Sequence, residues 1–232
     1  MLDKIKNSAE EAVAPIGDGA TIMVGGFMGV GTPESLVDAL VKKGVKNLTI
    51  ICNDGGWGGP ELKGGAPEVG IGKLIGKGQV KTLIASHVGL NPEVARRMST
   101  DNPAEKLEVV LVPQGTLVEQ IRAGGAGLGG VLTPTGVGTL VAEGKQVLNI
   151  DGRDYLLEKT LKADFALVRA SKVDKFGNCV FYGTTRNFNP IIATAVGYTI
   201  VGACEIVETG DIDPNIIHLS GVFVKAIVGG EK

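Results

Sequence analysis

What this chain lacks narrows the classes of protein to which it can belong. It has three cysteines in 232 residues, Cys52, Cys179 and Cys204, which are widely spaced and include no Cys-x-x-Cys pair. That spacing argues against both a disulfide framework and a zinc site, so we expect all three to be small buried hydrophobic residues. Aromatic residues are only 4% of the chain, and the formal net charge of -2 gives no reason to expect a nucleic acid or an acidic membrane as a partner.

The chain also lacks long apolar runs. The longest, such as residues 22–24 and 109–112, have the length of a strand, so we expect no membrane span. The N-terminus leads into an alanine- and glutamate-rich stretch rather than a basic region followed by an apolar run. This predicts no secretion signal and a cytoplasmic protein. At this length we expect a single domain over residues 1–232.

Several motifs of well-known chemistries are missing. No G-x-x-x-x-G-K-[ST] segment occurs, so nucleoside triphosphate chemistry has no support. The two histidines, His87 and His218, have no metal-ligand spacing and no serine or cysteine elbow, which argues against a zinc enzyme and a hydrolytic triad. We expect His87, at a strand end, to be an ordinary hydrogen-bonded histidine. Glycines at 125, 127 and 130 match G-x-G-x-x-G, but no strand precedes them and no helix follows, so we expect no dinucleotide site.

Glycine is plentiful: 36 of 232 residues, roughly twice the usual share of about 7%. The most informative cluster follows an apolar strand at residues 21–24 and comprises Gly25, Gly26, Gly29 and Gly31. These residues remove Cβ atoms where the chain turns, and we expect their N–H groups to face an anion or a carbonyl in a cleft, into which a side chain at Gly26 would project. Thr32 as N-cap and Pro33 as first helical residue predict a helix over 33–43 that Gly44 stops.

Short apolar runs alternate with helical stretches along the chain, which predicts an α/β fold with a largely parallel sheet. We expect strands at residues 21–24, 48–52, 80–85, 107–112, 165–170, 179–182, 198–201 and 223–228, and helices at 33–43, 92–98, 116–122 and 190–196. Two glycine- and proline-rich segments, 54–72 and 124–138, read as long irregular loops with a functional or interfacial role. Arg96 and Arg97, paired on a helix, could meet the phosphates of a ligand, but we expect them to lie on a solvated or inter-subunit face.

The residues from Asp18 to Pro33 resemble the first signature of the family I coenzyme A transferases: Asp-Gly, two residues, three apolar residues, Gly-Gly-Phe, three residues, Gly, one residue, Pro. Two later blocks strengthen the resemblance. Residues 113–139, beginning Pro-Gln-Gly-Thr, are similar to the central block of the α subunits of that family, and residues 186–190, Arg-Asn-Phe-Asn-Pro, to their end.

The resemblance implies an open, mostly parallel sheet flanked by helices, of the NagB/RpiA/CoA transferase-like type. It also implies the residues that bind coenzyme A or the acyl group: Gly25, Gly26, Phe27, Met28, Gly29, Val30, Gly31, Gln114 and Gly115. For Gln114 the alternative is that it holds its own loop together. For Asn187 and Asn189 we favour a structural or subunit-contact role over catalysis.

One residue that the family needs is absent. Its members transfer coenzyme A by ping-pong catalysis, in which a glutamate of a Glu-Asn-Gly motif forms first an acyl anhydride and then a glutamyl-CoA thioester. No glutamate of this chain has that context. The resemblance therefore implies an α subunit, itself without a catalytic residue, whose β subunit carries the glutamate, in an α2β2 assembly.

Acetate, butyrate and acetoacetate are the acids that the resemblance favours, and coenzyme A is then a substrate, with no cofactor and no metal. A longer glycine-rich segment at residues 55–67, with Trp57, could reshape the acyl pocket or a subunit contact. Two other hypotheses remain: a non-catalytic module that binds acyl-CoA or short acids, and a sugar-phosphate isomerase on a related fold, for which no carboxylate at a strand end is apparent.

Overall fold

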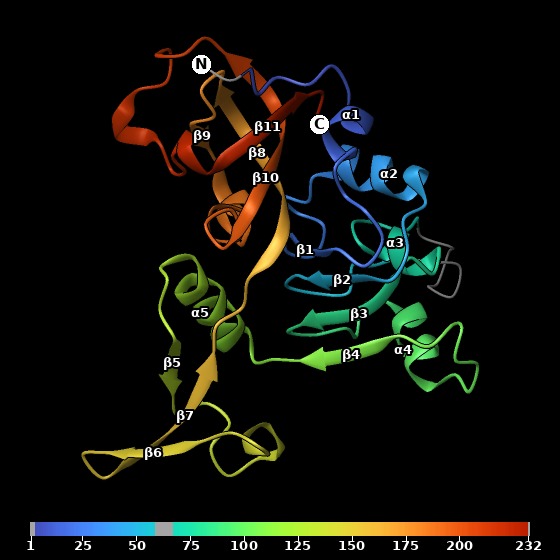
Figure 1. Ribbon diagram of the computed structural model, residues 1–232, viewed down its shortest axis with the longest axis vertical. Helices are drawn as coiled ribbons and strands as arrows, with labels where there is room; N and C mark the ends of the chain where they lie inside the picture. Colours follow the sequence, from blue (N-terminus) through green and yellow to red (C-terminus); the bar gives the residue numbers. More distant parts are fainter. Residues whose placement is uncertain (1–2, 59–66, 232) are drawn as a thin grey trace.

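The computed structural model describes residues 3–58 and 67–231, and its centre is one mostly parallel sheet (Figure 1). The strand order is β11-β10-β8-β1-β2-β3-β4, every neighbouring pair on this path is parallel, and β9 pairs antiparallel with β8. The strands of this sheet are β1 Thr21–Val24, β2 Leu48–Ile51, β3 Val80–Ala85, β4 Glu108–Leu111, β8 Ala163–Asp174, β9 Cys179–Val180, β10 Val196–Val207 and β11 Val224–Gly229. The α/β fold class predicted from the sequence is confirmed.

Helices cover both faces of the sheet, because successive strand residues point to opposite sides. Ile22 and Val24 of β1 pack with α1 to α4, whereas Met23 packs with α5 and α6. The helices are α1 Ala9–Val13, α2 Glu34–Lys43, α3 Gly72–Gly76, α4 Pro92–Ser99, α5 Gln114–Gly125 and α6 Asn189–Ile192. Each of these strand residues is at most 1% exposed, so the continuous apolar runs in the sequence reflect burial on both faces.

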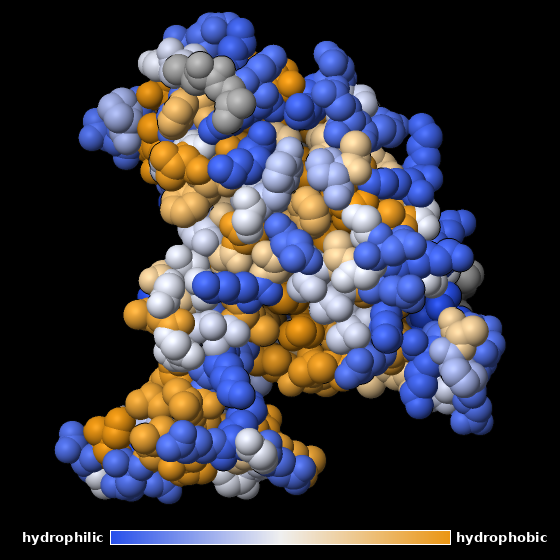
Figure 2. All heavy atoms as spheres, in the orientation of Figure 1, coloured by the Kyte–Doolittle hydropathy of each residue, from blue (hydrophilic) through white to orange (hydrophobic). Residues whose placement is uncertain are grey.

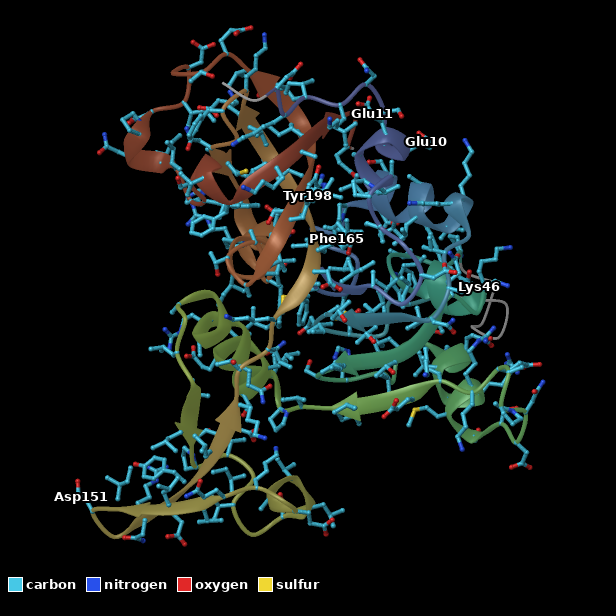
Figure 3. All side chains as sticks on the ribbon, viewed as in Figure 1. Glu10, Glu11, Lys46, Asp151, Phe165 and Tyr198 are labelled. Atoms are coloured by element: carbon cyan, nitrogen blue, oxygen red, sulfur yellow. The ribbon has the colours of Figure 1, made fainter. Side chains whose placement is uncertain are left out.

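Between α5 and β8 the chain forms a second, three-stranded antiparallel sheet, which we call the arm. Its order is β5-β7-β6, with β5 Gly130–Thr133, β6 Val147–Ile150 and β7 Arg153–Lys159. The arm projects from the body, and Asp151 lies at the tip of its β6–β7 hairpin (Figures 1 and 3). The sequence did not predict β6 and β7, because β6 exposes all but one of its residues and so lacks the pattern of a buried strand.

The expectation of a continuous irregular loop over residues 124–138 is also wrong in part. Helix α5 continues to Gly125, and Gly130 opens strand β5. The glycine fingerprint at 125, 127 and 130 thus follows a helix and runs into a strand, the reverse of a dinucleotide site. Of the segment 55–67, residues 59–66 lie outside the described part of the chain.

Three further expectations are corrected by the structure. The helix expected at 190–196 ends at Ile192, because the chain must turn at Ala193–Ala195 to start β10 beside β8. Pro33, not Thr32, is the N-cap of α2, and no side chain caps that helix. Cys52 and Cys179 are buried as expected, but Cys204 is exposed toward the end of β10.

The described part of the chain contains no helix that combines the length and the apolar character needed to cross a bilayer.

Arg96 and Arg97 on α4 both pair with Glu93, at 2.7 Å each, so the guanidinium groups are engaged within the chain.

Candidate active site at the carboxyl edge of the sheet

The carboxyl ends of β1 to β4 meet at one edge of the sheet, where ligands bind in open α/β folds. In Figure 1 the arrowheads of β2, β3 and β4 point to the same side, and Lys46, just before β2, lies at the opposite edge in Figure 3. The glycine loop follows β1, Asn53 and Asp54 follow β2, Ser86 and His87 follow β3, and Gln114 starts the helix after β4. The backbone of His87 forms a bridge with that of Asp54, and its side-chain role stays a prediction.

The tip of the glycine loop is a tight two-residue turn. Phe27 and Val30 exchange both backbone hydrogen bonds, at 3.0 and 2.9 Å, and the two residues between them have positive φ, 50° at Met28 and 83° at Gly29. This is the requirement of a type I′ turn. The turn presents its apolar side chains outward, since Phe27, Met28 and Val30 are 40%, 46% and 48% exposed. The loop therefore offers an apolar tip at the edge of the sheet.

The loop's N–H groups are mostly occupied, so the expectation that they all face a ligand is wrong. Gly25 donates to the Leu167 carbonyl and Gly26 to Asn187 Oδ1, and the tip residues are paired as described. Met28 N–H donates to Asp54 Oδ2 at 2.8 Å. Among the described residues, the N–H group of Gly29 has no protein acceptor and lies in the turn itself.

Three of the four glycines serve packing rather than ligand approach. A Cβ on Gly25 would lie 1.9 Å from Asn189 Oδ1, and one on Gly31 3.0 Å from Asn189 Nδ2. A Cβ on Gly26 would meet Thr32 Oγ1 at 2.2 Å, so it would not enter a ligand cleft as the sequence suggested. The cavity beside Gly25 and Gly26 is about 10 Å³, room for a single water. An acyl group cannot fit there.

Asn187 and Asn189 hold the loop from the far end of the chain. Asn187 Oδ1 accepts from Gly26 N–H at 3.2 Å and its Nδ2 donates to the Val30 carbonyl at 2.9 Å. Asn189, fully buried, donates from Nδ2 to the Gly31 carbonyl at 2.8 Å and accepts the Arg169 N–H at Oδ1, 2.9 Å away. These contacts confirm the structural role that the sequence favoured for both asparagines.

A polar chain links the loop to Gln114. Asp54 Oδ2 accepts from Met28 N–H and from Asn53 Nδ2, both at 2.8 Å. Asn53 Oδ1 in turn accepts from Gln114 Nε2 at 2.6 Å. Gln114 thus reaches β2 rather than only its own loop. Sequence analysis missed Asn53 and Asp54, although a polar pair directly after a buried strand is a usable signal for this edge.

Two hollows lie beside these residues. One, of about 480 Å³, is lined by Phe27, Val30, Thr184, Arg186 and Asn187. A second, of about 460 Å³, lies between α5 and β5 and is lined by Gly115, Thr116, Glu119, Arg122, Val131, Leu132, Thr133 and Thr135. The structure therefore brings Gln114 to the glycine loop but places Gly115 on the neighbouring hollow.

The nearby titratable groups give no obvious nucleophile. Burial, and next the charge of Asp54, raise the pKa of the Cys52 thiol well above its usual value. Burial and the Arg186 guanidinium lower the pKa of His218, whose Nδ1 accepts the Phe181 N–H at 3.0 Å. The described residues include no cluster of three or more His, Cys, Asp or Glu side chains that could hold a metal ion.

Comparison with known proteins points to one family. Residues 6–230 match the family described as coenzyme A transferase. The chain is 51% identical, over 96% of both chains, to the acetate CoA-transferase subunit alpha of Escherichia coli K12. It is 49% identical, over 91% of both chains, to the acetoacetyl-CoA:acetate/butyrate CoA transferase alpha subunit of Clostridium acetobutylicum.

Among solved structures, the chain resembles the acyl-CoA transferase YdiF of E. coli O157:H7 in its thioester complex with coenzyme A. The TM-score is 0.81 at 26% identity, over 98% of this chain and 47% of that one. The present chain thus spans about half the length of the YdiF chain.

Proposed function

The chain belongs to the coenzyme A transferase family. On that premise we propose that it works as the α subunit of a two-subunit enzyme. This enzyme moves coenzyme A between a short-chain acyl-CoA and an acid such as acetate, butyrate or acetoacetate. The observation that carries the proposal is the full-length likeness to α subunits in a chain without a Glu-Asn-Gly glutamate. The reaction then runs through a glutamyl-CoA thioester on the β subunit. We infer an α2β2 assembly in the cytoplasm, with coenzyme A as a substrate and no cofactor.

In this proposal the carboxyl edge described above is the α half of the active site. The turn at residues 27–30 contributes apolar contacts to the acyl chain, and the N–H group of Gly29 is available to a carbonyl oxygen. Gln114, held by Asn53, positions its amide at the same edge. Asn187 and Asn189 keep the loop in the shape that these contacts need.

Exposed apolar side chains support a partner on this side of the molecule. Strand β4 is an edge of the main sheet, and its last residues Val110 and Leu111 are 41% and 54% exposed. On the arm, Leu140 is 82% and Val147 49% exposed, and apolar atoms cover much of the arm in Figure 2. An open edge strand with apolar side chains normally has a cover. A β subunit seated there would lie next to the carboxyl edge, where the glutamate is needed.

The first test is to assay transfer from acetyl-CoA to butyrate or acetoacetate with this chain alone, and then with the partner chain that carries a Glu-Asn-Gly motif. We expect turnover only in the mixture, because the nucleophile is on the partner. Replacing the glutamate of that motif by glutamine should remove nearly all activity. Turnover by the purified chain alone would contradict the proposal, and tight binding of acyl-CoA with no transfer in the mixture would favour a binding module.

Replacing Gly115 by alanine tests whether that residue contacts a substrate. A Cβ there meets nothing within 4 Å in the chain and lies in the first turn of α5. We expect the free energy of unfolding to stay the same or rise by up to about 1 kcal/mol, since alanine is the better helix residue. If the proposed contact exists, kcat/KM should fall by about tenfold as the methyl group enters it. The control is Gly17→Ala, whose Cβ also meets nothing within 4 Å. Unchanged kcat/KM in Gly115→Ala would remove this residue from the site.

A further inference from the structure

The arginines of the described chain differ in their partners. Arg96, Arg97 and Arg122 each pair with a glutamate, at 2.7, 2.7 and 2.5 Å. Arg186 is exposed in the short 3-10 turn Gly183–Arg186, where its Nε donates to the Phe181 carbonyl at 3.2 Å. No carboxylate of residues 3–58 or 67–231 pairs with its guanidinium, so its remaining N–H groups are available to an anion or a carbonyl.

The hollow beside Arg186 presents mainly apolar surface. It has a volume of about 480 Å³ and is otherwise lined by Phe27, Val30, Thr184 and Asn187. The volume falls in the range of small-molecule sites, about 300–1,000 Å³. A hollow with hydrocarbon walls and one guanidinium fits a short hydrocarbon chain that carries an oxygen acceptor.

The hollow is also held against the glycine loop. Asn187, the residue after Arg186, bonds to Gly26 N–H and to the Val30 carbonyl, so the segment that carries the arginine is tied to the tip. Of the described residues that line the hollow, only Arg186 carries a charge. Arg186 is therefore the positive charge that a ligand in the hollow meets.

We propose that Arg186 is a specificity-determining residue: its guanidinium binds the oxygen acceptor that a substrate acid carries away from its reacting carboxylate, a 3-oxo group or a second carboxylate. The reacting carboxylate must face the partner's glutamate, so it is not the group in the hollow. Plain alkyl acids then fill the hollow without meeting the guanidinium, whereas 3-oxo acids and dicarboxylates use it. This inference rests on the function proposed above and deepens it.

Acetoacetate and butyrate give a closely matched test, because they differ only in a carbonyl in place of a methylene. We would measure kcat/KM for both acids, and for succinate, with the assembled enzyme carrying Arg186, Arg186→Met or Arg186→Lys. The wild type is expected to prefer acetoacetate to butyrate. In Arg186→Met the preference for acetoacetate should fall by about tenfold or more, because a charge-assisted hydrogen bond is lost, while kcat/KM for butyrate changes little. Arg186→Lys should retain part of the preference.

The control is Lys46→Met, an exposed cation at the opposite edge of the sheet (Figure 3), which should leave the preference unaltered. Three results would overturn the assignment. An unchanged preference in Arg186→Met is the first. A KM increase for acyl-CoA alone would assign Arg186 to the coenzyme A phosphates, and loss of assembly in gel filtration would assign it to a subunit contact. Failure of the proposed function looks different, since the wild-type enzyme would then transfer to none of these acids.

Discussion

Valine in place of Gly26 is expected to destabilise the chain by about 3 kcal/mol or more and to remove most transferase activity. Two costs combine. The residue has φ +120°, a conformation that side chains rarely adopt, and such strain costs on the order of 1–3 kcal/mol. Its Cβ would also lie 2.2 Å from Thr32 Oγ1 and 3.1 Å from the Thr32 backbone nitrogen, and overpacking of that kind costs about 1–3 kcal/mol.

The activity is lost because the strain falls on the loop that shapes the site. Moving Thr32 or Gly26 disturbs the bond from Gly26 N–H to Asn187, and with it the turn at residues 27–30. Urea unfolding of the chain and the transfer assay with the partner measure the two effects. Gly19→Val is the control, since Gly19 also has positive φ, +76°, but open space around its Cβ. Equal losses of stability in the two variants would mean that Thr32 moves away from the new side chain at no cost in free energy. Wild-type turnover in Gly26→Val would exclude the loop from the mechanism.

The second large effect is expected for Asn189→Leu, about 3–5 kcal/mol of stability. Leucine has the same branched shape but is larger, and it makes none of the three bonds that the Asn189 amide makes, to the Arg169 N–H and to the carbonyls of Gly31 and Thr185. Each unsatisfied buried group costs about 1–3 kcal/mol. Since Gly25 packs directly on the Asn189 amide, the bulkier apolar group also pushes on the loop.

Chemical denaturation of the isolated chain measures this loss, and amide hydrogen exchange at Met28 and Val30 reports whether the loop has loosened. The matched control is Asn215→Leu, at an exposed position where the side chain bonds only to nearby Asp213, so its effect should stay within about 0.5 kcal/mol. A loss below about 1 kcal/mol in Asn189→Leu would show that the three backbone groups find other partners.

The helices and strands that could be predicted are those whose signals lie in neighbouring residues of the sequence. Strand β3 was predicted over Val80–Ala85 with its observed bounds, because a short segment rich in apolar and β-branched residues stands between Gly78 and Ser86. Helix α2 was predicted to within one residue, since Gly44 ends it in the left-handed conformation that glycine favours. The arm was missed because its strands pair mainly with each other and bury little: β6 has no buried residue, and β7 buries only Leu156 and Glu158.

In the candidate site, too, the residues with a local sequence motif could be predicted and those that depend on distant contacts could not. The glycine loop and Gln114 could be named from their motifs, and the structure places Gln114 on the polar chain that ends at the loop. Asn53, Asp54 and Arg186 were not named as site residues, because each acquires its role only from a neighbour distant in sequence. Gln114 lies 61 residues from the Asn53 that it binds.

Residue types within short windows were enough to predict the strand, glycine loop and helix at residues 21–43, the α/β class and the family. They also showed that no glutamate stands in a Glu-Asn-Gly context. What each glycine does depends instead on contacts between distant segments. Gly25 and Gly31 make room for Asn189, whose bond to Gly31 joins residues 158 positions apart, and Gly26 makes room for Thr32. A window of sequence cannot encode such contacts, since they arise when the parallel sheet brings the carboxyl ends of distant strands to one edge.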